Sequence, residues 1–111
     1  IKEKLSSEYV MLIEAQNKDK TDTKVSRIAM CSGAGFDFIS QAKKCGAQLY
    51  LTGEAKHNEL LEATAGDTDF VLAGHFATER VVVKPLADMI NEKFPDCNVK
   101  CADDTEPVRI F

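Results

Sequence analysis

Short apolar runs with the length of β-strands recur along the chain, at residues 9–13, 25–31, 48–52 and 69–73. The second run alternates at first and then becomes fully apolar, which is typical of a strand that enters a covered sheet. The pattern therefore predicts four strands. A fifth strand is expected at residues 97–101, where two cysteines four positions apart would face the same side of the sheet.

Helical periodicity alternates with these runs. Apolar residues at helical spacing predict a helix over residues 36–45 and a second one that ends before the glycine at position 66. Gly46 and Gly66 stand where C-terminal glycine caps usually end helices. Strand, glycine turn and helix thus follow one another in repeated βα units.

The longest helical pattern covers residues 78–93 and contains Pro85. A proline in a helix interior removes a hydrogen bond and costs about 3 kcal/mol, so two alternatives stand. Either the helix is kinked at Pro85, or it begins near Val82 and takes the proline into its first turn. Pro95 ends the pattern after Phe94.

Alternating strands and helices predict an α/β fold with a mostly parallel sheet and helices on both faces. The chain has 111 residues and 44% apolar content, which suits a single domain with a real core. Ligands of such sheets bind outside the carboxyl ends of the strands. Three turns occupy these ends, at residues 32–35, 52–57 and 74–79, and hold nearly all the unusual polar residues.

Composition narrows the class of partner. The formal net charge is -4 and the basic residues are scattered, so neither a nucleic acid nor a membrane is an expected partner. No run approaches the roughly eighteen apolar residues of a membrane span, and the charged first residues do not form a signal peptide. We expect a cytoplasmic protein with reduced cysteines. Because the chain starts at Ile1 rather than at a methionine, we also expect residues upstream.

The first turn, Ser32-Gly33-Ala34-Gly35, invites comparison with dinucleotide-binding loops, in which glycines let the backbone approach phosphate. The third glycine of that pattern is replaced by Phe38, whereas Glu54 imitates the acid that binds ribose. A plain tight turn between strand and helix is the favoured interpretation, with nucleotide binding as the alternative.

The other two turns hold both histidines of the chain. In the second, Glu54 could be a general base or a helix-start acid, and His57 a metal ligand, a proton carrier or a surface residue. In the third, His75 and Glu79 are four apart, so a helix would place them on one face, able to hold one divalent metal ion. The alternative is a surface histidine beside a helix capped by Thr78. The shared position at strand ends favours a site.

Four segments, in this order, resemble the C-terminal half of a known family. They are Cys31 to Gly35, Gly46 to Glu54, His57, and above all Gly74-His75-Phe76-Ala77-Thr78-Glu79-Arg80. Together they resemble the GTP cyclohydrolase I type 2-like family, also called the NIF-three-like family. The resemblance covers residues 25–111, with residues 1–24 as a variable lead-in, and implies one lobe of a two-lobed α/β protein.

The resemblance implies a dinuclear metal site in which His75 and Glu79 are ligands. The remaining ligands, a His-His pair and an aspartate, would come from an N-terminal lobe that this chain does not contain. Two divalent ions, zinc, iron or manganese, would fill the complete site. The chain alone is therefore expected to bind metal weakly or not at all, because two ligands do not make a stable site.

For the full-length protein, the resemblance implies metal-dependent hydrolysis of a nucleotide-like or other small substrate. Glu54 and His57 would then serve as catalytic groups, in contact with the substrate or carrying protons, and the isolated chain would be inactive. The alternative is a non-catalytic interaction or regulatory module with a structural metal. In both cases the expected partners are the N-terminal lobe and further copies of the protein, in a homo-oligomer such as a hexameric ring.

Overall fold

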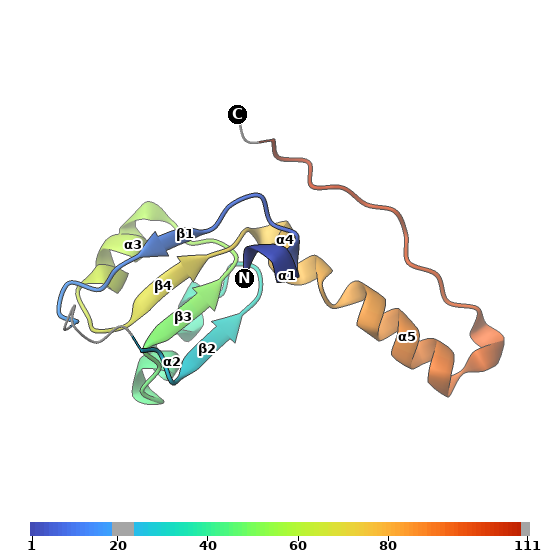
Figure 1. Ribbon diagram of the computed structural model, residues 1–111, viewed down its shortest axis with the longest axis horizontal. Helices are drawn as coiled ribbons and strands as arrows, with labels where there is room; N and C mark the ends of the chain where they lie inside the picture. Colours follow the sequence, from blue (N-terminus) through green and yellow to red (C-terminus); the bar gives the residue numbers. More distant parts are fainter. Residues whose placement is uncertain (19–23, 110–111) are drawn as a thin grey trace.

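The body of the molecule is a four-stranded sheet with the strand order β1, β4, β3, β2 (Figure 1). The structure is a computed structural model that describes residues 1–18 and 24–109. The strands β2, β3 and β4 are parallel, and β1 pairs with β4 in the antiparallel direction. The predicted α/β class with a mostly parallel sheet is thus confirmed. The strands are β1 (Met11–Ile13), β2 (Ile28–Cys31), β3 (Leu49–Thr52) and β4 (Asp69–Leu72).

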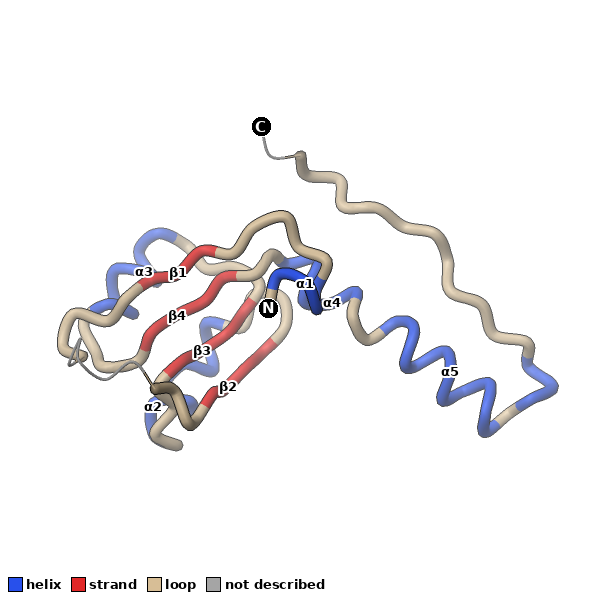
Figure 2. The backbone as a smooth tube through the Cα atoms, in the orientation of Figure 1, coloured by secondary structure: helices blue, strands red, loops and turns tan. Residues whose placement is uncertain are grey.

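Helices follow the parallel strands in the predicted alternation (Figure 2). The start of the helix after β3 is set by Glu59, whose carboxylate accepts a hydrogen bond from the backbone N–H of Lys56 at 2.7 Å. The helical elements are α1 (Lys2–Leu5), η1 (Phe36–Phe38), α2 (Ile39–Lys44), α3 (His57–Thr64), α4 (His75–Arg80), α5 (Val83–Lys93) and η2 (Pro95–Cys97), of which η1 and η2 are single 3-10 turns.

The core lies between one face of the sheet and the helices α2 and α3, which lie behind the strands in Figure 1. Tyr50 and Phe70 are paired across β3 and β4, and their rings meet edge to face with centroids 5.9 Å apart. Both side chains are fully buried. Small or branched residues of the two helices complete the cluster, namely Ile39, Ala42 and Ala63.

Among the described residues, the opposite face of the sheet is exposed along its edge strands, although Val71 at its centre is only 5% exposed. The strand registers place Leu12, Ile28 and Met30 on this face, and their side chains are 59%, 53% and 72% exposed. Helices on both faces were expected because strands and helices alternate along the chain. The described chain instead covers one face, because the helix that follows α4 leads away from the sheet (Figure 1).

The long helical pattern is divided into two helices, α4 and α5. The second begins at Val83, with Val82 at its N-cap, so Pro85 is its third residue and lies in the first turn. The backbone N–H that a proline lacks has no partner within the helix at this position. The alternative without a kink is therefore confirmed. As predicted, α5 stops at Lys93, before Phe94 and Pro95.

The fifth strand predicted at residues 97–101 is wrong. The 3-10 turn η2 ends at Cys97, and Asn98 adopts a left-handed conformation with φ 46°, which interrupts an extended run. The side-chain amide of Asn91 then bonds to both the N–H and the C=O of Val99, at 2.8 and 2.9 Å. These backbone groups thus find partners on α5 rather than in the sheet.

Helix α5 extends away from the body of the molecule, and the stretch after η2 turns back towards it (Figure 1). The radius of gyration is 16.6 Å, whereas a compact domain of this length has about 13 Å. Apolar side chains of α5 remain exposed, among them Leu86 and Met89. In the described part of the chain, no helix is long and apolar enough to cross a membrane.

Asp69, at the start of β4, forms side-chain contacts with the N-terminal segment. Replacing Asp69 tests how much these contacts stabilise the protein. Asp69 accepts a hydrogen bond from Ala15 N–H at 3.0 Å and pairs with the Lys18 ammonium at 2.5 Å. Burial opposes the charge, but these two contacts outweigh burial and hold the pKa of Asp69 below its usual value. Asp69→Asn should therefore lower the free energy of unfolding at neutral pH by about 1–3 kcal/mol, measurable by urea denaturation.

The lowered pKa of Asp69 also determines how the stability of the protein depends on pH. Because the folded-state pKa lies below the unfolded value of 3.8, the stabilisation is present above 3.8 and is lost as the pH falls towards the folded-state pKa. The Asp69→Asn variant should lack this part of the acid dependence. Asp88→Asn removes the carboxylate of an exposed pair with Lys84 and serves as the control, with little expected change. Equal losses in the two variants would contradict the assigned role.

Candidate functional site

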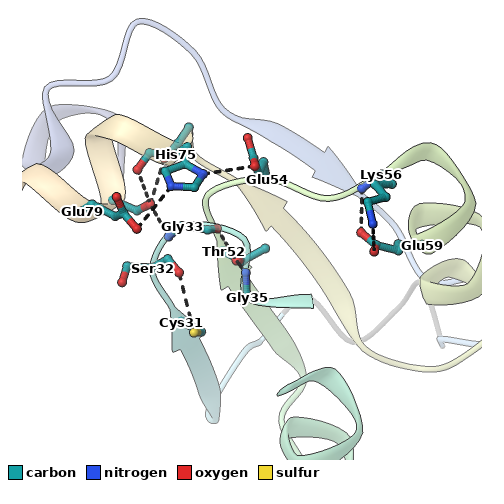
Figure 3. A network of polar contacts seen from close by, with 12 residues as sticks. Cys31, Ser32, Gly33, Gly35, Thr52, Glu54, Lys56, Glu59, His75 and Glu79 are labelled. Atoms are coloured by element: carbon teal, nitrogen blue, oxygen red, sulfur yellow. Dashed lines mark hydrogen bonds and ion pairs between the residues drawn. The ribbon is translucent and has the colours of Figure 1, made fainter. Parts of the chain in front are cut away.

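The carbonyl oxygen of Gly33 joins the first two polar turns at the carboxyl edge of the sheet. It accepts hydrogen bonds from the backbone N–H of Gly53 at 2.8 Å, from that of Glu54 at 3.1 Å, and from the Thr52 hydroxyl at 3.0 Å. Figure 3 shows Gly33 and Thr52 close together at the end of β3. The two turns are therefore held in one fixed arrangement, with the start of the Glu54 side chain at the junction.

The same residue also joins the third turn. Gly33 N–H donates to the hydroxyl oxygen of Thr78 at 3.0 Å, and Thr78 is only 6% exposed. The Thr78 hydroxyl lies 2.9 Å from the carbonyl oxygens of Gly74 and His75 and donates its single proton to one of them. The first turn thus contacts helix α4 through a buried hydrogen bond.

The backbone N–H groups of the two glycines in the first turn are used within the protein. Gly33 N–H bonds to Thr78, and Gly35 N–H donates to the Thr52 hydroxyl at 3.0 Å. Tyr50 also donates its hydroxyl proton to the Gly35 carbonyl oxygen at 2.6 Å, and burial is the main cause that raises the pKa of Tyr50 to about 12. These hydrogen bonds are those of a tight turn between strand and helix, and such a turn is the interpretation of Ser32 to Gly35 that the sequence favours.

Helix α4 begins at His75, immediately after Gly74, whose φ of 91° suits a glycine. Thr78 is the fourth residue of the helix and not its cap. Helical geometry therefore includes both His75 and Glu79, and His75 Nε2 lies 3.2 Å from Glu79 Oε1. The predicted placement on one face is confirmed, while the role of the two residues as metal ligands stays a prediction.

Glu54 reaches the same imidazole from the second turn. Its Oε1 lies 3.1 Å from His75 Nδ1, so the ring stands between two carboxylates, as Figure 3 shows. The hydrogen bond with Glu54 is the main cause that raises the pKa of His75, and it outweighs slight desolvation; the charge of Glu79 acts in the same direction. Metal binding would therefore have to displace a proton that the two carboxylates stabilise.

Gly33 leaves room for this group. A Cβ atom at this position would lie 2.5 Å from Glu79 Oε1 and 3.3 Å from His75 Nε2, and the φ of +63° is itself unfavourable for other residues. The absence of a side chain at Gly33 thus lets the His75 and Glu79 donors lie directly over the first turn.

The donors of α4 fit a divalent metal ion in chemistry and in spacing. Imidazole nitrogen and carboxylate oxygen are common ligands of zinc, iron and manganese. Two such donors on one ion are about 3.0–3.4 Å apart, and the observed distance is 3.2 Å. Within the described residues, no group of three or more His, Cys, Asp or Glu side chains is arranged to hold a metal ion.

His57 lies apart from this group. It is the first residue of α3 and is exposed, and within residues 1–18 and 24–109 it forms no hydrogen bond or ion pair with the other three predicted site residues. The structure thus brings together Glu54, His75 and Glu79. The catalytic role expected of His57 stays a prediction.

An open cleft of about 1100 Å³ adjoins the group. His75 and Glu54 form part of its wall, and the rest comes from α1 and the loop after it, from α4 and α5, and from residues 101–109. Charges of both signs line it, including Arg80 and Lys84 as well as Glu8. Its volume slightly exceeds the range of about 300–1,000 Å³ that is typical of small-molecule sites, so the cleft leaves room for a substrate to reach the imidazole.

Three residues that hold the site together were missed as such by the sequence analysis. Thr52, Gly53 and Thr78 act through hydrogen bonds or through close approach between turns that are distant in sequence. Hydrophobic periodicity carries no signal for such contacts. The only available signal was the position of small and hydroxyl residues at the ends of parallel strands.

Comparison with known proteins identifies the relatives of this chain. The sequence pattern of the family described as Duf34/NIF3 (NGG1p interacting factor 3) matches residues 1–107. A "GTP cyclohydrolase 1 type 2 homolog" from Yersinia pestis is 36% identical over 76 residues, which are 68% of this chain and 31% of the relative. A protein of the same description from Escherichia coli is 35% identical over 83 residues, which are 75% of this chain and 33% of the relative.

Solved structures show the same fold. The protein ybgI, described as of unknown function, superimposes with a TM-score of 0.78 at 28% identity, over 96% of this chain and 41% of that chain. The chain therefore spans about a third of the length of the curated relatives and less than half of that solved structure.

Proposed function

Because the chain belongs to the Duf34/NIF3 family, we propose that it is the metal-binding lobe of a GTP cyclohydrolase I type 2-like protein. His75 and Glu79 supply two ligands of a dinuclear site for zinc, iron or manganese. An N-terminal lobe supplies the remaining ligands, and the complete protein hydrolyses a nucleotide-like or other small substrate.

The observation that carries this proposal is the arrangement of His75 and Glu79 on the exposed face of α4. The two side chains are 44% and 56% exposed, and exposed pairs of this kind add little to stability. A contribution to stability therefore does not explain why His75 and Glu79 lie next to each other. The donor spacing and the adjoining cleft both suit a metal that meets a substrate.

When bound, divalent metal ions would supply Lewis-acid polarisation and activation of water. The residues of this chain hold and orient the groups around that chemistry. The buried hydrogen bond between Gly33 and Thr78 fixes the start of α4, and the Gly33 carbonyl fixes the second turn. The cleft beside His75 admits the substrate.

Calorimetric titration with zinc tests the proposal. The chain should bind zinc with a micromolar or weaker dissociation constant, because it supplies only two ligands. His75→Ala should remove this binding. His57→Ala is the matched control, since it replaces the other histidine of the chain, which is also exposed, and it should bind zinc like the unchanged protein.

Two results would contradict the proposal. Zinc binding that persists in His75→Ala would show that the metal is held elsewhere. Equal losses in His57→Ala and His75→Ala would show non-specific binding to imidazole. In a protein that also contains the N-terminal lobe, the same His75→Ala change should abolish hydrolysis while the assembly stays intact.

The exposed apolar surface favours a second candidate, a ring-forming interaction or regulatory module with a structural metal. Met30 on the open sheet face and Met89 on α5 are 72% and 65% exposed, which is typical of surfaces that another lobe or subunit covers. On this alternative, His75→Ala changes the size of the homo-oligomer in light scattering, and there is no hydrolysis to lose.

A further inference from the structure

Glu54 contacts the imidazole of His75 on the side opposite to Glu79. The two nitrogens of the ring point in different directions, and each faces one carboxylate, Glu54 at 3.1 Å and Glu79 at 3.2 Å. An ion bound at Nε2 together with Glu79 would therefore lie on the far side of the ring from Glu54. Glu54 is not placed to share that ion, although it is bonded to the same imidazole (Figure 3).

The backbone of Glu54 is held in place by hydrogen bonds, while its side chain is 58% exposed. The Glu54 N–H donates to the carbonyl oxygen of Gly33 at 3.1 Å, and the preceding Gly53 N–H donates to the same oxygen. His75 is fixed to the same turn, because Thr78 of its helix accepts the Gly33 N–H. Glu54 and His75 are thus both anchored to Gly33, and their contact does not depend only on a long exposed side chain.

A neutral imidazole that binds a metal through Nε2 must carry its proton on Nδ1. A carboxylate that accepts this proton fixes the tautomer, orients the ring and makes the free nitrogen a better ligand. We propose that Glu54 is the positioning residue of the metal site: it accepts the Nδ1–H of His75 and so directs Nε2 towards the ion shared with Glu79. This inference rests on the proposed function, since it requires a metal at His75.

Glu54 thus has a different role from the one that the sequence predicts. From the sequence, Glu54 is a catalytic candidate that contacts the substrate or carries protons. The geometry instead makes it a group that acts through His75. Its loss should therefore weaken metal binding without removing a ligand.

Titration of the protein with cobalt(II), followed by its visible absorption, tests this role. Glu54→Ala should lower the affinity for cobalt by about 100-fold and Glu54→Gln by about 10-fold, because the glutamine oxygen can still accept the Nδ1–H without the charge. At saturation, the absorption envelope should match that of the unchanged protein, since the ligands are the same. Glu62→Gln, which removes an exposed carboxylate from α3, controls for the change in net charge and should not alter the affinity.

Each other result overturns the inference. If Glu54→Gln and Glu62→Gln bind cobalt equally well, Glu54 has no specific role. If the envelope of Glu54→Ala indicates fewer ligands, Glu54 is itself a ligand. If His75→Ala binds cobalt like the unchanged protein, both the proposed metal site and the positioning role are wrong. If His75→Ala loses cobalt binding but the Glu54 variants do not, only the positioning role of Glu54 is wrong.

Discussion

Gly53→Ala should lower the free energy of unfolding by about 1–3 kcal/mol and abolish zinc binding at His75. A Cβ atom at this position would lie 2.7 Å from the carbonyl oxygen of Gly33, 2.7 Å from the Thr78 hydroxyl and 2.9 Å from His75 Cα. Two of these atoms belong to the backbone and cannot rotate away. Relief of the overlap must therefore separate the three turns. Urea denaturation followed by circular dichroism, and a zinc titration of the folded variant, measure the two effects.

Gly66→Ala is the matched control for this substitution. A Cβ atom there would first meet Lys43 Nζ at 3.1 Å, at the end of a flexible side chain that can move aside. We expect this variant to change stability by less than about 1 kcal/mol, because its backbone conformation does not require glycine. Equal stability of the two variants would show that the turns tolerate a wider separation than the structure indicates.

Phe70→Ala should lower the free energy of unfolding by about 3–5 kcal/mol, the usual cost of truncating a fully buried phenylalanine. Phe70 is 0% exposed, lies on β4, one of the two inner strands, and packs edge to face against Tyr50. Its removal leaves a cavity between the sheet and the helices α2 and α3. The shift of the urea midpoint at constant slope gives the loss.

Phe94→Ala provides the comparison, because this side chain is 51% exposed at the end of α5. The expected change is below about 1 kcal/mol. If both substitutions cost the same, α5 packs against the sheet more closely than the structure shows, and the core is not confined to the one covered face.

The elements of the sheet could be predicted from the sequence because their signals are local. The alternation of apolar runs with helical spacing gave all four strands and the helices between them, and the i, i+4 spacing gave the shared face of His75 and Glu79. The glycine before His75 marked the start of α4. The division of the chain into a lead-in of residues 1–24 and a core of residues 25–111 stays a prediction.

The parts that could not be predicted depend on contacts between distant residues. Nothing in the spacing of Glu54 shows that the Gly33 carbonyl draws it towards His75. Residues 97–101 have a strand-like composition, but the backbone of Val99 forms hydrogen bonds with the side chain of Asn91 instead of with a neighbouring strand. The direction of α5 could not be predicted from the sequence either, since an amphipathic pattern shows which face is apolar but not what that face contacts.

The open face of the sheet has a consequence for how assembly and chemistry relate. The residues on this face, such as Ile28 and Met30, project sideways from the strands, whereas Glu54, His75 and Glu79 lie beyond the strand ends. The sheet face and the strand ends are therefore different surfaces of the molecule. We expect a further copy of the protein that covers this face to leave the imidazole accessible, whereas the N-terminal lobe proposed to complete the metal site must approach the strand ends.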